Sequence, residues 1–92
     1  MRIDAVFVIK RRGVVVTGQV GAGTVRVGDT VWVADRAFQV DAIEAFRRSI
    51  DTASAGDDVG LLFRAAEKSD FTVGGMLGGG PGSHETPATF TL

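Results

Sequence analysis

The stretch that decides the fold runs Gly13-Val14-Val15-Val16-Thr17-Gly18-Gln19-Val20 and continues, after two residues, as Gly23-Thr24-Val25-Arg26-Val27-Gly28-Asp29. Valine and threonine are branched at Cβ and favour an extended backbone. The glycines at the ends of both segments mark places where the chain can turn. The stretch therefore predicts two short strands joined by a glycine turn.

Short strands are also expected on both sides of this stretch. The segment Ile3–Ile9 is rich in β-forming residues and ends in Lys10-Arg11-Arg12-Gly13, which predicts a hairpin with Val14–Val20. Further strands are expected at Thr30–Ala34, at Phe38–Phe46 with a bulge near Ala42, at Val59–Arg64 in the centre of the sheet, and at Val73–Leu77. Two other segments are interpreted differently: Asp51–Asp58 as a connection and Ala65–Asp70 as one helical turn.

The pattern as a whole indicates an all-β protein, because it contains no helical period of useful length and no internal repeat. We expect about six to seven antiparallel strands in a small closed β-barrel, an arrangement that leaves no exposed sheet edge. At 92 residues, the chain has the length of one domain with one core. We place the barrel at residues 1–83 and expect residues 84–92 to form a flexible C-terminal tail.

Composition excludes several classes of function. Ten lysines and arginines stand against eleven aspartates and glutamates, so no overall positive field draws the chain to nucleic acid, and any RNA contact must be local. The absence of cysteine and the presence of one histidine argue against disulfides and metal sites. No apolar run approaches the ~20 residues that cross a bilayer. We therefore expect a soluble, cytoplasmic protein without metal or membrane contact.

No catalytic or nucleotide-binding motif is complete. A phosphate-binding P-loop needs a Gly-Lys pair, which the sequence lacks, and Gly21-Ala22-Gly23 has Arg26 where a dinucleotide fingerprint needs a third glycine. The consecutive residues Ser83-His84-Glu85 point apart in an extended segment and cannot form a catalytic triad. Asp57 and Asp58 are typical of a turn. We expect no enzyme and no cofactor.

Several blocks of the sequence, in the right order, resemble domain 2 of translational GTPases, the β-barrel of elongation factor Tu. These blocks are Asp4–Phe7, Gly13–Gly18, Gly23–Asp29, Ile43–Arg48, Ala55–Leu62 and Pro81–Ser83. The resemblance implies a noncatalytic barrel that normally works beside a GTPase domain, which 92 residues cannot also contain. The guanine-reading motif of such GTPases requires an asparagine, and the sequence has none, so we expect no GTP binding by this chain.

The basic run Lys10-Arg11-Arg12 lies at the end of the predicted hairpin, where three adjacent cations can meet phosphates. The resemblance implies that this tip contacts ribosomal RNA of the small subunit. The alternative is that a hairpin tip is simply where solvated charges lie. The tip departs from the family's Gly-Arg-Gly because Arg11 stands at the first glycine position, which adds a charge and puts the turn geometry in question.

The resemblance also implies a pocket for the aminoacyl end of tRNA, at Asp4, Phe7, Thr17 and Asp58, while a second acidic position falls on Ala5 and is lost. Asp58 replaces an amide that can donate a hydrogen bond with a carboxylate that only accepts. This change would repel an RNA backbone or the carbonyl of the substrate, although it suits a positive amino group. For Phe7 and Thr17 the alternative is ordinary packing within a strand.

Trp32 alternates with Val31 and Val33, which predicts an outward indole. An exposed tryptophan is a candidate anchor for a protein interface, although single surface aromatics are also common. Two functions thus stay open: an RNA-binding or ribosome-binding module in translation, and a protein-interaction barrel that has lost the RNA role. A third possibility is a fragment or partner of a larger translational GTPase.

Overall fold

The computed structural model describes residues 1–80 of the chain. These residues form nine β-strands and one short 3-10 helix. All strand pairs are antiparallel, which confirms the all-β class. The expectations for Pro81–Ser83, for the Ser83-His84-Glu85 motif and for the tail 84–92 fall outside the described residues.

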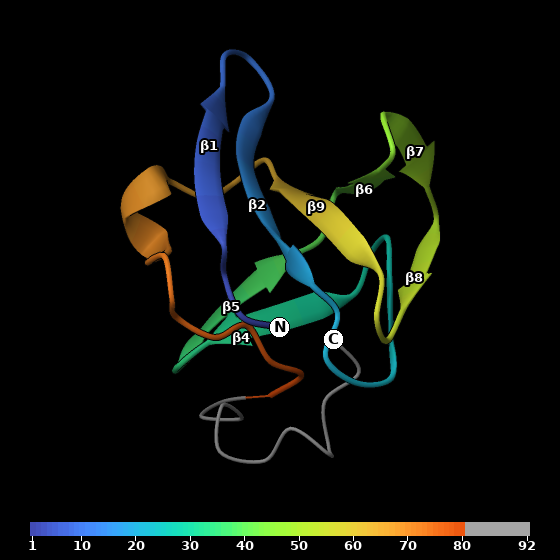
Figure 1. Ribbon diagram of the computed structural model, residues 1–92. Coiled ribbons are helices and arrows are strands. Elements are labelled where there is room, and N and C mark those ends of the chain that lie inside the picture. Colours follow the sequence, from blue (N-terminus) through green and yellow to red (C-terminus); the bar gives the residue numbers. More distant parts are fainter. Residues whose placement is uncertain (81–92) are drawn as a thin grey trace.

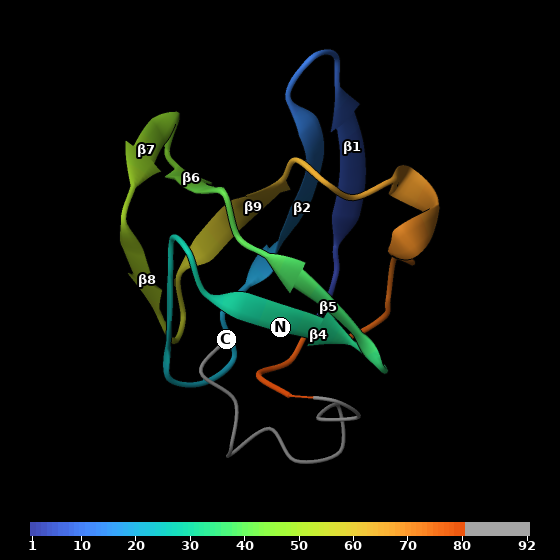
Figure 2. The same cartoon turned by 180° about the vertical axis from the view of Figure 1, so that it is seen from behind.

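Three sheets make up the fold (Figures 1 and 2). The elements are β1 (Ala5–Ile9), β2 (Gly13–Gln19), β3 (Thr24–Arg26), β4 (Thr30–Val33), β5 (Arg36–Gln39), β6 (Ala42–Ala45), β7 (Arg48–Ile50), β8 (Thr52–Ser54), β9 (Asp58–Phe63) and η1 (Lys68–Asp70). The main sheet has five strands in the order β1-β2-β9-β6-β7, and β3-β8 and β4-β5 form two-stranded sheets. As the sequence predicts, β9 is the central strand.

The segment 76–78 connects the main sheet with the β4-β5 pair. Arg2, just before β1, forms a bridge with Met76. Gly78 exchanges two backbone hydrogen bonds with Trp32 of β4, at 2.8 and 2.9 Å. The strands expected to form one small barrel are thus arranged in three hydrogen-bonded sheets, and two bridges through the segment 76–78 connect the main sheet with the β4-β5 pair. Within residues 1–80, no helix is long and apolar enough to cross a membrane, and no group of three or more metal-ligating residues could hold an ion.

The middle of the chain differs from the expected single strand Phe38–Phe46. The chain leaves β5 after Gln39 and enters β6 at Ala42, in a different sheet. Val40 and Ile43 are both buried, which an unbroken two-residue alternation does not allow. The change of sheet therefore supplies the register shift that the sequence suggested as a bulge near Ala42.

The segment Asp51–Asp58, expected to be a connection, contains the strand β8, which pairs with β3. Just before it, the unexpected strand β7 pairs back on β6. Each has three residues, too few to show a two-residue period in the sequence. The range Val73–Leu77 forms no strand; it has one bridge, at Met76, and backbone hydrogen bonds to Met1 and Ile3. These differences account for nine strands instead of six to seven over the described part.

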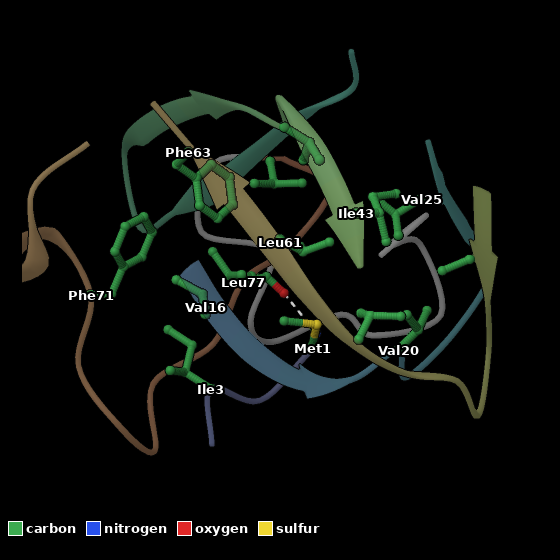
Figure 3. Packing of buried hydrophobic residues seen from close by; sticks show 14 of the residues in the cluster. Met1, Ile3, Val16, Val20, Val25, Ile43, Leu61, Phe63, Phe71 and Leu77 are labelled. Carbon is green, nitrogen blue, oxygen red and sulfur yellow. Dashed lines mark hydrogen bonds between the residues drawn. The ribbon is translucent and has the colours of Figure 1, made fainter. Parts of the chain in front are cut away.

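The core lies between the main sheet and the two smaller ones (Figure 3). Val14 and Val16 of β2 and Leu61 and Phe63 of β9 are buried, because alternate residues of both strands point inward. Phe63 packs on Phe71 with their ring centroids 5.1 Å apart. Each such side chain contributes about 1.5–3 kcal/mol when it is fully buried. The core therefore fixes the inner face of β2 and β9. On the outer face of β9, Leu62 is buried as well, at 1% exposure.

The short helix η1 is held to β5 by an ion pair between Arg36 and Asp70. The guanidinium of Arg36 also lies over the ring of Phe38, 5.3 Å from its centroid. The backbone N–H of Glu67 donates to Asp70 at 2.7 Å. This hydrogen bond, with Arg36 as a further cause, lowers the pKa of the Asp70 carboxyl below its usual range. These contacts fix the segment that passes beside the β1-β2 hairpin.

Candidate nucleic-acid interface

The β1-β2 hairpin carries the basic tip predicted from the sequence. Ile9 pairs with Gly13, and the N–H of Arg12 donates to the carbonyl of Ile9 at 2.9 Å, which closes a three-residue loop. Lys10, Arg11 and Arg12 are all exposed. The hairpin thus holds three cations side by side, away from the core.

The turn geometry of the tip is glycine-like although Arg11 is not glycine. Arg11 has φ +66°, in the left-handed region, and Gly13 has φ +133°. A side chain in the left-handed region costs roughly 1–2 kcal/mol for most residues. Non-glycine residues held there tend to lie at functional positions. Arg11 thus has a backbone conformation that glycine adopts readily, and its side chain adds a cation.

Replacing Arg11 with glycine tests this strain. We expect Arg11→Gly to raise the free energy of unfolding by about 1 kcal/mol, because glycine adopts this φ without a steric penalty. Arg12→Gly is the matched control, since Arg12 is equally exposed but has no positive φ. It should lower the stability by roughly 0.5–1 kcal/mol instead. Chemical denaturation of both variants checks the prediction, and a change of the same sign in both would contradict it.

The structure adds Arg64 and Lys68 to the surroundings of the tip. Both line the same groove as Arg11 and Arg12, at the end of the hairpin. These two residues could not be recognised from the sequence, because their place beside the tip depends on the register of β2 against β9, which pairs Val14 with Phe63. One sequence signal for Arg64 was available: it is a cation directly after the predicted central strand.

The residues of the pocket implied by resemblance divide between two places. Phe7, Thr17 and Asp58 lie on the outer face of the main sheet, since their register positions alternate with the buried residues of β2 and β9. Phe7 is 51% exposed. Asp4 and Asp58 line a separate cavity of about 470 Å³ together with Arg2. The structure therefore brings the two carboxylates together, but not all four residues into one cavity.

Trp32 is half-buried, which corrects the expectation of an exposed indole. The bridge between Trp32 and Gly78 places another segment beside β4 at this position. The alternation of Val31, Trp32 and Val33 could not reveal this neighbour, because it comes from a distant part of the chain. The most exposed aromatic residue of the described part is instead Phe46, at 91% exposure, followed by Phe7 at 51%.

Phe46 and Arg47 form the turn between β6 and β7, with φ +53° and +64°. Both are non-glycine residues in the left-handed region, as in a two-residue hairpin turn. This turn lies at the same end of the molecule as the β1-β2 tip (Figures 1 and 2). Phe46 was not expected at the surface, because the alternating pattern predicts one strand that continues through it.

Comparison with known proteins agrees with this architecture. The model of the family "Elongation factor Tu domain 2" matches residues 13–78. The translation elongation factor SelB of Methanococcus maripaludis, in its apo form, is similar over 84% of this chain, with 35% identity and a TM-score of 0.74. A bacterial selenocysteine-specific elongation factor, EF-Sec, is similar over 82% of this chain, with 25% identity and a TM-score of 0.74.

The matched region is a small part of these larger proteins. It covers 18% of the SelB chain and 13% of the EF-Sec chain. The family model covers well over half of the present chain, including β2 through β9 and the segment up to Gly78. The chain therefore belongs to the elongation factor Tu domain 2 family.

Proposed function

We propose that this chain is a noncatalytic binding module of translation that contacts ribosomal or transfer RNA through the tip Lys10–Arg12. The observation that carries the proposal is the geometry of the tip, where three exposed cations stand on a short loop. Among residues 1–80 none of these three side chains forms an ion pair, since Arg36 and Asp70 make the salt bridge found there. The cations are therefore available to a partner.

A loop with three exposed cations is suited to bind phosphate groups. Arginine presents planar donors that match phosphate oxygens, and lysine acts as a compact point charge. The net charge of the whole chain is −1, so the attraction for RNA is confined to this end of the molecule. The matching family model and the similar protein SelB are both of translation elongation factors, and this supports RNA as the partner.

The outer face of the main sheet contributes less to the proposal. Asp58 is exposed beside Gln19, and Asp4 lies near it around the same cavity. Two carboxylates repel a phosphate backbone, so an RNA strand is favoured at the tip and disfavoured here. A role for Phe7 and Thr17 in holding an aminoacyl end stays a proposal that the tip does not require.

The test is the variant in which Lys10, Arg11 and Arg12 are all replaced by alanine. We expect its affinity for a fluorescently labelled RNA hairpin to fall at least about tenfold, and the slope of log K against log salt to become shallower by about 2. The fold should stay intact, because the three side chains are exposed. Fluorescence anisotropy across a salt series measures both quantities.

A charge-matched control removes three exposed arginines elsewhere. These are Arg2, Arg26 and Arg48, each replaced by alanine. If this control weakens RNA binding as much as the tip variant, the binding is general electrostatic attraction and the tip has no special role. If only the tip variant loses affinity, the proposal holds.

Protein binding is the second candidate, and one observation favours it. Phe7, Val8 and Ile9 of β1 are exposed together, by 51%, 61% and 38%. Adjacent exposed apolar residues on an edge strand are typical of a contact with another protein or domain. A pull-down from native lysate, with and without ribonuclease, separates the two functions. A single partner retained after ribonuclease treatment supports protein binding, and loss of translation components on treatment supports RNA binding.

A further inference from the structure

A groove of about 570 Å³ lies beside the basic tip, and residues from a second segment of the chain also line it. Arg11 and Arg12 line one wall, on the β1-β2 loop, and Arg64 and Lys68 line the other, on the segment that follows β9. This segment passes across β2 and β1 on its way to η1 (Figure 2). The volume of the groove is within the range of about 300–1,000 Å³ that ligand clefts have.

Backbone contacts fix the two walls relative to each other. Gly13, at the base of the loop, packs so closely on β9 that an added Cβ would lie 2.8 Å from the Cα of Arg64. The N–H of Arg64 donates to the carboxylate of Asp41 at 2.7 Å. The close packing against Gly13 therefore holds Arg64 next to the loop, and the hydrogen bond fixes its backbone to the β5-β6 connection. The groove is a built feature of the fold.

The groove carries an excess of positive charge. Four cations line it, and Glu67 is the one acidic residue on its walls. In the described part of the chain none of the four cations has an ion-pair partner, because the salt bridge found there joins Arg36 and Asp70. Unpaired cations on two facing walls attract a polyanion and hold it from both sides.

Apolar residues also line the groove. Val8 and Ile9 of β1 are among them and are 61% and 38% exposed. A strand of nucleic acid presents both phosphates and apolar faces of sugar and base, and a groove lined by both cations and apolar residues matches both. Three of the four cations are arginines, whose planar donors suit phosphate oxygens.

We infer that this groove binds the sugar–phosphate backbone of an RNA strand, with the loop arginines on one side and Arg64 and Lys68 on the other. The inference rests on the proposed RNA-binding function and extends the site to a second segment of the chain. An acidic protein segment is the competing occupant, and the test includes it.

The test replaces Arg64 and Lys68 together with glutamine, which keeps the side-chain length similar and removes the charge. With a labelled single-stranded RNA and a labelled RNA hairpin as probes, we expect about tenfold weaker binding and a salt slope shallower by about 1–2. Arg26→Gln is the control, because Arg26 is exposed on β3 and lies outside the groove. Arg64→Lys should keep the salt slope of the original chain, since the charge is retained. Thermal melting of each variant confirms that it is folded.

The outcomes separate the inference from the function on which it rests. If the tip variant loses RNA affinity and the Arg64 and Lys68 variant behaves like Arg26→Gln, the groove is not the binding site and the tip acts alone. If the original chain binds neither RNA probe, both proposals are overturned. If a labelled polyglutamate peptide binds more tightly than either RNA, and loses this affinity in the groove variant, the occupant is an acidic protein segment and the inference is wrong.

Discussion

Replacing Gly18 with alanine is expected to destabilise the fold by at least about 3 kcal/mol, a large fraction of the 5–15 kcal/mol that holds a typical domain together. Gly18 is buried on the inner face of β2, where the chain before β1 crosses it. An added Cβ would overlap the carbonyl oxygen of Arg2 and lie 3.1 Å from the Cγ of Met1. A backbone atom cannot rotate away, so the N-terminal segment must shift.

This shift has a structural consequence that reaches beyond β2. Met1 donates its amino group to the carbonyl of Leu77 at 2.7 Å (Figure 3), and Arg2 forms the bridge to Met76. Displacement of residues 1–2 therefore releases the segment 76–78 that connects the main sheet to β4. The loss should appear as lower stability in chemical denaturation and as faster hydrogen exchange at Leu77.

Gly21→Ala is the matched control for Gly18→Ala. Gly21 follows the same strand by a few residues, is exposed, and an added Cβ there meets no heavy atom within 4 Å. We expect its stability to change by less than about 0.5 kcal/mol or to rise slightly, because alanine restricts the unfolded chain. Similar losses in both variants would show that glycine is needed for flexibility and that the contact with Arg2 is irrelevant.

The parts of the fold that the sequence predicts well are those built from local patterns. The β1-β2 hairpin follows from two β-branched segments around a charged turn, and the central position of β9 follows from its nearly continuous apolar run. The positions of Val14 and Val16 in the core follow from alternation. In each case the signal lies within a few neighbouring residues.

The parts that the sequence predicts poorly depend on contacts between distant segments. Trp32 is half-buried because the chain near Gly78 returns beside β4. The single strand expected at Phe38–Phe46 breaks because its halves pair with different strands. The candidate site divides in the same way. The basic tip could be predicted from neighbouring residues, whereas Arg64 lies beside the tip only because Val14 of β2 pairs with Phe63 of β9.

Gly13→Ala is expected to damage the fold and the groove together. Gly13 has φ +133°, and an added Cβ would lie 2.5 Å from the carbonyl oxygen of Phe63 and 2.8 Å from the Cα of Arg64. The strained backbone costs about 1–3 kcal/mol, and the overlap with two backbone atoms of β9 adds a similar amount. We expect a loss of about 2–6 kcal/mol in chemical denaturation.

Gly28→Ala separates the two causes of this loss. Gly28 also has a positive φ, at +97°, but no heavy atom lies within 4 Å of an added Cβ. It should therefore show the backbone cost alone, about 1–3 kcal/mol, and no change in RNA binding. Equal losses of stability in the two variants would mean that the contact between Gly13 and β9 is unimportant.

The effect of Gly13→Ala on RNA binding connects this packing to the proposed function. Relief of the overlap must move the base of the β1-β2 loop away from Arg64, which widens the groove without removing any charge. Under conditions where the variant is folded, we expect weaker RNA binding with an unchanged salt slope, because the number of cations is unchanged while their spacing is not. Unaltered affinity would mean that the spacing between the loop and Arg64 does not matter to binding, and that the tip alone is sufficient.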